Sequence, residues 1–176
     1  MAILAGPFLV ATGLLGAGGA VKVVRPATTA RALGDLGLPA STTLVRVGAA
    51  TELAVATFAM VDAGRLSAAL VAASYLAFFA FVLAALRRSV PLSSCGCFGV
   101  ADTPPTTLHL GINAAAAGVA GAVAFGWAEG GGLTEITTME APLLLRAAFV
   151  VLTAASLWFA YVALTALPKL HAAGRP

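Results

Sequence analysis

The sequence predicts an all-α integral membrane protein, a compact bundle of five transmembrane helices in a single domain over residues 1–176. Of its 176 residues, 60% are hydrophobic and only 10% are charged, whereas about a quarter of a soluble domain is charged. The mean hydropathy is +0.99. The surface of a small soluble domain cannot hide so much apolar area. The composition therefore excludes a soluble enzyme, a disordered protein and a nucleic-acid-binding protein.

Five apolar stretches are long enough to cross a bilayer, because a hydrocarbon core of about 30 Å needs about 20 helical residues. We expect the spans at about residues 2–24, 42–61, 65–86, 106–127 and 141–167. The first stretch has no basic residues before it, and it is longer than the apolar region of a secretory signal. We therefore expect this first span to be retained.

Turn and capping signals separate the five stretches. A short interfacial helix is expected over residues 26–38, and the short turn at 62–64 makes the second and third spans an antiparallel hairpin. Pro105 places proline at the start of the fourth span, where its missing N–H costs nothing. Thr137 and Glu140 fit a capping box before the fifth span.

Small residues recur at spacings of three or four in the first and fourth spans, which places them on one face of each helix and lets backbones approach closely. Such faces serve either dimerisation or packing within the chain, and the Ala- and Gly-rich composition favours packing. The residues are Gly13, Gly16, Gly18 and Ala20, then Gly111, Ala115, Gly118 and Ala122.

The basic residues are distributed unequally between the two sides that five spans define. One side carries only Arg65 and Arg146. The positive-inside rule then predicts an external N-terminus, with the C-terminus and the loop after the third span in the cytoplasm. The other side carries Lys22, Arg25, Arg31, Arg46, Arg87, Arg88, Lys169 and Arg175.

The two cysteines of the chain, Cys95 and Cys97, lie close together in the sequence Ser-Cys-Gly-Cys-Phe-Gly. A disulfide within Cys-X-Cys closes a very small ring, so its geometry must depart from relaxed values. Strained disulfides are oxidising and are readily reduced or passed on. This pair therefore favours thiol-disulfide exchange over a structural role.

Residues near the dithiol suggest how its thiols are tuned. Positive charge from Arg87 and Arg88 favours thiolate, although both arginines also serve as topology anchors. His109 can take or give a proton, or make an interfacial hydrogen bond, and Asn113 lies one turn further along the same face. With the two thiolates His109 offers three soft-metal ligands for Cu(I) or Zn(II), but a closed zinc site needs four. Metal binding is therefore the weaker interpretation, and we assign no metal ligands.

Glu52 lies near the middle of the second span, where an ionised carboxylate is costly unless it is paired or beside water. Lys22 ends the first span and can reach toward it. Two interpretations remain open, a helix–helix ion pair and a proton or quinone-headgroup partner for the dithiol. The aromatic residues from Tyr75 to Phe81 could likewise flank a quinone, although such residues more often pack or face lipid.

These residues together resemble the MauE (methylamine utilisation) family, which is related to the DoxX-like membrane proteins. The resemblance covers about residues 5–165 and rests mainly on the Cys-Gly-Cys-Phe-Gly motif after the third span. Three further matches are Gly-Ala-Val-Lys ending at Lys22, Leu-Gly-Leu-Pro before the second span, and Glu52. The fourth span departs from the family, because His109 stands near a place where many relatives have an arginine.

The resemblance implies a four-helix DoxX-like core plus one helix, in the inner membrane of a bacterium. It also implies a thioredoxin-like partner, a redox role for Cys95 and Cys97, and intramembrane charges at Lys22 and Glu52. A membrane thiol-disulfide redox protein that assists maturation of partner proteins is the function we expect. The alternatives are a non-enzymatic accessory subunit of a membrane complex and a soft-metal (copper) handling protein. One dithiol needs a second electron carrier, either a quinone or a partner protein.

Overall fold

The structure is a computed structural model in which residues 4–88, 105–138 and 140–167 are described. Five of its helices are long and apolar enough to cross a membrane. They confirm the predicted all-α fold, and each predicted span agrees with its helix to within a few residues. Two shorter helices, α2 (Pro26–Asp35) and α6 (Leu133–Thr138), lie between them. The long helices are α1 (Ala5–Val24), α3 (Thr42–Val61), α4 (Arg65–Arg87), α5 (Thr107–Ala124) and α7 (Leu143–Thr165).

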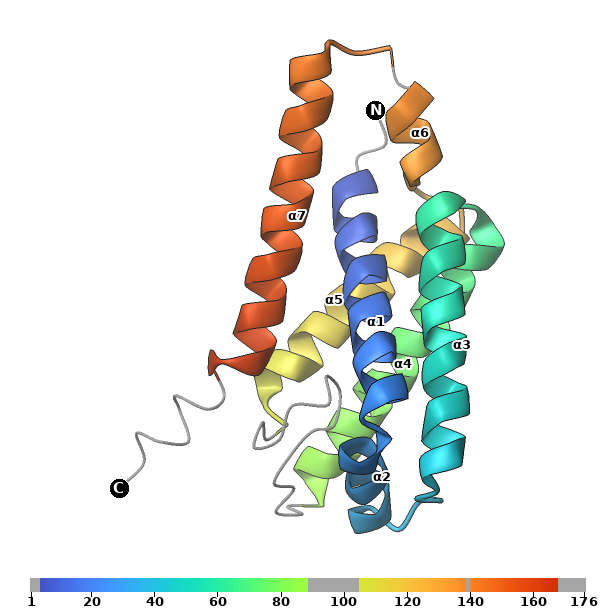
Figure 1. The fold of residues 1–176 in the computed structure, drawn as a ribbon, viewed down its shortest axis with the longest axis vertical. Helices are drawn as coiled ribbons and strands as arrows, with labels where there is room; N and C mark the ends of the chain where they lie inside the picture. The colour runs from blue at the N-terminus through green and yellow to red at the C-terminus, as the bar shows by residue number, and fades with distance from the viewer. Residues whose placement is uncertain (1–3, 89–104, 139, 168–176) are drawn as a thin grey trace.

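Four of the long helices form the core, and the fifth lies at its edge (Figure 1). Helix α1 packs along α3, α4 packs along α5, and α7 contacts mainly α1. The only buried residue of α7 is Leu164. The chain is therefore a multi-pass membrane protein with a four-helix core. Its central buried cluster is Phe8, Ala11, Leu15, Ala56, Ala59, Ala68, Val71, Tyr75, Ala116, Ala117, Ala120 and Val123.

The connections at the two ends of α3 follow from local sequence. Helix α2 confirms a short helix in the predicted stretch 26–38, and its interfacial position stays a prediction. The helix ends before Gly37, whose positive φ of 72° lets the Leu38 N–H donate to the Leu33 carbonyl at 2.9 Å. At the other end, the tight hairpin between α3 and α4 is confirmed. The Ser67 hydroxyl closes it by donating to the Asp62 carbonyl at 2.6 Å.

Two predicted helix starts are wrong in detail. Helix α5 begins at Thr107, so Pro105 precedes the helix instead of occupying its first position. The predicted capping box is absent from the described part of the chain, because α7 is preceded by Pro142 without a side-chain cap. Thr137 instead lies in the short helix α6, where its hydroxyl donates to the Thr134 carbonyl at 2.7 Å.

In the first span Gly13, Gly16 and Gly18 pack within the chain, as the composition favoured, whereas Ala20 is exposed, and the small residues of the fourth span lie largely outside the core. A Cβ added at Gly16 would lie 3.3 Å from the Ala56 Cβ, so α1 and α3 approach closely there. On α5, Gly111 and Gly118 are exposed, and a Cβ at either would meet nothing within 4 Å. The buried face of α5 instead carries His109, Asn113, Ala116, Ala117, Ala120 and Val123, which leaves this stripe outside the core.

We expect Gly19→Ala to destabilise the protein by about 1–3 kcal/mol, the usual cost of overpacking. A Cβ at Gly19 would lie 2.9 Å from the Ala49 carbonyl oxygen and 3.1 Å from the Leu53 nitrogen, and these backbone atoms cannot move aside cheaply. Gly118→Ala is the matched control, since removing a mid-helix glycine there should stabilise by about 0.5–1 kcal/mol. Unfolding in detergent micelles measures both, and equal shifts would contradict the tight α1–α3 contact.

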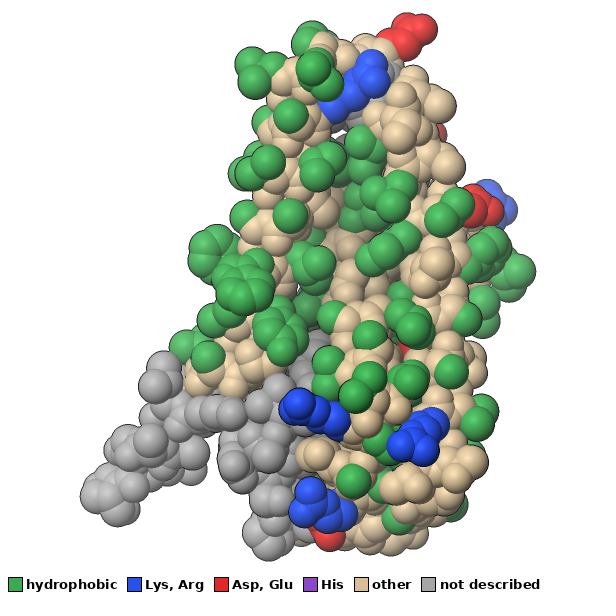
Figure 2. Space-filling view, viewed as in Figure 1, with side chains coloured by type: hydrophobic (Ala, Val, Ile, Leu, Met, Phe, Trp, Pro, Cys, Tyr) green, Lys and Arg blue, Asp and Glu red, His purple; other side chains and the backbone are tan. Residues whose placement is uncertain are grey.

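Basic side chains gather at the end of the bundle formed by α2 (Figure 2). This basic end also includes the C-terminal end of α1, the start of α3 and the end of α4, according to the helix boundaries. Arg65 begins α4, and Arg146 lies in the first turn of α7, at the opposite end. The described residues thus keep the charge asymmetry seen in the sequence. The basic residues at the α2 end are Arg25, Arg31, Arg46, Arg87 and Arg88.

Candidate functional site

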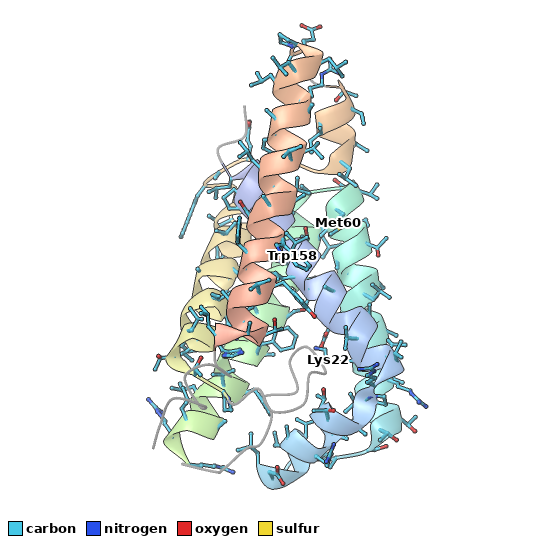
Figure 3. The ribbon with its side chains drawn as sticks, turned by 60° about the vertical axis from the view of Figure 1, so that its left-hand side comes forward. Lys22, Met60 and Trp158 are labelled. Carbon is cyan, nitrogen blue, oxygen red and sulfur yellow. The ribbon has the colours of Figure 1, made fainter. Side chains whose placement is uncertain are left out.

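A buried ion pair joins α1 to α3 near the basic end. Lys22 lies in the last turn of α1, and its Nζ forms a salt bridge with Glu52 Oε2, the two side chains being 5% and 18% exposed. In Figure 3, Lys22 lies toward the end of the bundle that carries α2, whereas Met60, near the C-terminal end of α3, lies toward the opposite end. The close packing at Gly19, where a Cβ would lie 3.3 Å from the Glu52 Cβ, brings the two charges together. The structure thus contains the ion pair that was one of the two interpretations of Glu52, and the other, a proton or quinone-headgroup partner for the dithiol, stays a prediction.

Aromatic residues of α4 complete the surroundings of Lys22. The Lys22 Nζ lies 4.5 Å from the centroid of the Phe78 ring, within the range of a cation–π interaction. Phe78 meets Tyr75 edge to face, with ring centroids 6.0 Å apart. The Tyr75 hydroxyl donates to the Ala11 carbonyl of α1 at 2.6 Å. The sequence singled out these aromatic residues but did not show that they join α4 to α1 beside the lysine.

A groove between α2, α3 and α4 reaches the ion pair, and we call it the ion-pair groove. Its volume is about 520 Å³, within the range of small-molecule sites. Most of its lining is aliphatic or aromatic, and the ion pair supplies a buried charged donor and acceptor. The lining residues are Lys22, Thr29, Leu33, Leu36, Leu38, Leu44, Val45, Gly48, Ala49, Glu52, Ala77, Phe78, Ala80, Phe81, Ala84 and Arg88.

Arg88 fixes the outer part of this groove. Its Nη1 donates to the Leu36 carbonyl at 2.9 Å, which ties the end of α4 to the end of α2. Leu36 also packs with Ala32 and Ala85 in a small apolar cluster, and Phe81 contacts that cluster. The sequence did not predict this structural contact of Arg88. The expected influence of Arg88 and of the exposed Arg87 on the pKa values of the thiols stays a prediction.

His109 and Asn113 face a second, smaller cavity of about 30 Å³ on the other side of Lys22. His109 is only 2% exposed, and its Nδ1 shares a hydrogen bond of 2.9 Å with the Thr106 hydroxyl. Tyr75 lines the same cavity. A space of this size holds a water molecule, so the cavity can carry a polar link between the histidine and the lysine. The predicted shared face of His109 and Asn113 is confirmed.

Cys95 and Cys97 lie in residues 89–104, outside the described residues. Arg88 and Pro105, the described residues on either side, lie at the ends of α4 and α5 that share the basic end with α2 (Figure 1). The described ranges contain no group of three His, Cys, Asp or Glu side chains placed to hold a metal. The proposed roles of the two thiols and of His109 toward them therefore stay predictions.

Comparison with known proteins identifies one family. The model of the family described as methylamine utilisation protein MauE matches residues 1–128, which include α1 to α5 and the segment with both cysteines. Helix α7 lies beyond the matched residues. Neither the curated proteins nor the solved structures contain a match to this chain.

Proposed function

Because this chain belongs to the MauE family, we propose that it is a membrane thiol-disulfide redox protein that assists maturation of partner proteins, as in methylamine utilisation. In this proposal the Cys95–Cys97 dithiol exchanges electrons with a thioredoxin-like or cysteine-containing partner. The observation that carries the proposal is that the family match spans the segment containing the chain's two cysteines. The most direct activity consistent with it is that of a thiol-disulfide oxidoreductase.

The chemistry of the pair supports this assignment. A thiolate attacks one sulfur of a partner disulfide, a mixed disulfide forms, and the partner's other sulfur leaves as a thiolate. The second cysteine then attacks the mixed disulfide, which leaves the partner fully reduced and Cys95–Cys97 oxidised. The reverse sequence oxidises a partner dithiol. The buried His109, near the start of α5, is a candidate to take or give a proton in these steps.

The charge distribution supports a cytoplasmic basic end. Cytoplasmic loops carry an excess of Lys and Arg, and the end with α2 carries more of both than the opposite end. We place the protein in the plasma (inner) membrane of a bacterium, with the N-terminus outside. The C-terminus and the segment 89–104 then lie on the cytoplasmic side.

Thiol labelling on each face of the membrane tests both the redox role and the orientation. A membrane-impermeant maleimide should leave intact cells unlabelled, with or without prior reduction. Inverted vesicles should be labelled only after reduction of the oxidised form. Labelling of intact cells after reduction would contradict the proposed orientation and place the dithiol outside. Thiols that never change their redox state on either side would contradict the redox role.

The second candidate function is a non-enzymatic accessory subunit, and one observation favours it. The open stripe around Gly111 and Gly118 on α5 leaves a small-residue face without a neighbour in the described chain, and such faces suit close helix association in membranes. In that case a Cys95→Ser/Cys97→Ser variant would still assemble with its complex and retain function. Loss of function with intact assembly would decide for the redox role.

A further inference from the structure

We infer that the ion-pair groove binds the ring of an isoprenoid quinone, a lipid-soluble carrier of two electrons. The inference rests on three features of the groove. An ion pair without net charge lies at its inner end, aromatic side chains line its walls, and it opens at the surface that we expect to face the bilayer. Its redox use rests on the proposed function, whereas the binding itself does not.

The charges at the inner end select a neutral ligand head. The Lys22 ammonium and the Glu52 carboxylate form a salt bridge, so the pair carries no net charge. A phosphate would meet the carboxylate as well as the ammonium. A quinone carbonyl can accept a hydrogen bond from the ammonium, and a quinol hydroxyl can donate one to the carboxylate. The same two side chains therefore match both oxidation states of one ligand.

The walls of the groove suit a flat ring with an apolar tail. Phe78 and Phe81 line it from α4, and aromatic side chains pack against other rings face to face or at an offset. Leu44 of α3 also lines the groove and is 53% exposed. Gly48, one turn further along α3, lines the groove and is exposed as well. Because α3 is long and apolar enough to span the membrane, we expect this open rim to face lipid. A ligand dissolved in the bilayer can thus enter laterally and leave its tail outside.

A quinone in this groove would be the second electron carrier that the dithiol needs. Arg88 lines its outer part and directly precedes the segment that contains Cys95 and Cys97. When the dithiol forms one disulfide bond it releases two electrons and two protons, and a quinone that takes up the same two electrons and two protons becomes a quinol. The reverse transfer reduces the disulfide and regenerates the quinone.

Photolabelling of the full chain in lipid nanodiscs tests the site. The probe is an azido derivative of a short-chain ubiquinone, competed with unlabelled short-chain ubiquinone or menaquinone, and mass spectrometry locates the label. We expect competable labelling of α3 and α4. Gly48→Leu should reduce it about tenfold or more, because Gly48 lines the groove and a Cβ there meets nothing within 4 Å. Gly118→Leu, equally open but outside the groove, should leave it unchanged.

Two further variants separate binding from folding and from redox chemistry. Lys22→Met/Glu52→Leu removes the pair as a unit and should weaken binding about tenfold to a hundredfold, the loss expected for charge-assisted hydrogen bonds. Cys95→Ser/Cys97→Ser should bind normally, so failure of the thiol chemistry leaves this result intact. Two results would overturn the quinone site. One is labelling that Gly48→Leu does not reduce. The other is labelling that phosphatidylglycerol competes away but unlabelled quinones do not.

Discussion

Lys22→Met and Glu52→Gln are each expected to lower the free energy of unfolding by about 3–5 kcal/mol, the usual cost of removing one partner from a buried ion pair. The Lys22 side chain is only 5% exposed, so in Glu52→Gln its ammonium stays inside the bundle without a carboxylate. In Lys22→Met the carboxylate of Glu52 loses its counter-ion in the same surroundings. Denaturation of the purified protein in detergent micelles measures both effects.

The double variant Lys22→Met/Glu52→Leu should be close to wild type in stability. Replacing a buried pair by apolar residues of similar size is often neutral or stabilising, since two desolvation costs disappear with the attraction. With Glu52→Leu added as a single variant, the coupling between the two sites is obtained from a double-mutant cycle of Lys22→Met, Glu52→Leu and the double variant. Arg46→Met is the matched control on α3, because Arg46 is exposed and exposed substitutions usually stay within about 0.5 kcal/mol. Single variants as stable as this control would contradict a stabilising role for the pair.

This comparison also separates stability from function. A merely structural pair predicts that the stable double variant retains every activity of the wild type. A pair that also serves as the inner end of the ion-pair groove predicts a folded double variant that no longer binds a quinone. The cation–π contact of Lys22 with Phe78 disappears in this variant too, so the measured coupling includes part of the aromatic packing.

The spans were predictable because their signals are local. An apolar stretch of about 20 residues is needed to cross the bilayer, and the short turn at 62–64 leaves α3 and α4 no arrangement other than a hairpin. The ion pair was foreseen as one of two interpretations, since Glu52 in an apolar span needs a partner and Lys22 lies within reach. The starts of α5 and α7 were predicted wrongly because their signals fit more than one structure. Pro105 suits the residues before a helix as well as its first turn, and Thr137 suits the interior of the short helix α6 as well as a helix cap.

The arrangement around Lys22 was not predictable, because it depends on how each helix is rotated about its axis. In a membrane, lipid tails are as apolar as leucine, so the hydrophobic pattern says little about which face meets another helix. The hydrogen bond from Tyr75 to the Ala11 carbonyl and the cavity shared by His109 and Lys22 both depend on that rotation. For the same reason the open stripe on α5 was mistaken for a packing face.

Single-cysteine variants test the proposed thiol-disulfide exchange most directly. Either Cys95→Ser or Cys97→Ser removes the thiol that would resolve the mixed disulfide, so the adduct with the partner should accumulate in cells. We expect at least one of the two variants to form a covalent complex that reductant dissociates, whereas wild type shows little and Cys95→Ser/Cys97→Ser shows none. Mass spectrometry should map the bond to a cysteine of the partner.

The two outcomes of this measurement separate the candidate functions. A reducible adduct joined through Cys95 or Cys97, and absent from the double variant, is the result predicted for a protein that exchanges disulfides with its partner. Equal behaviour of wild type, both single variants and the double variant, with no adduct in any of them, would contradict the redox role and favour the accessory subunit.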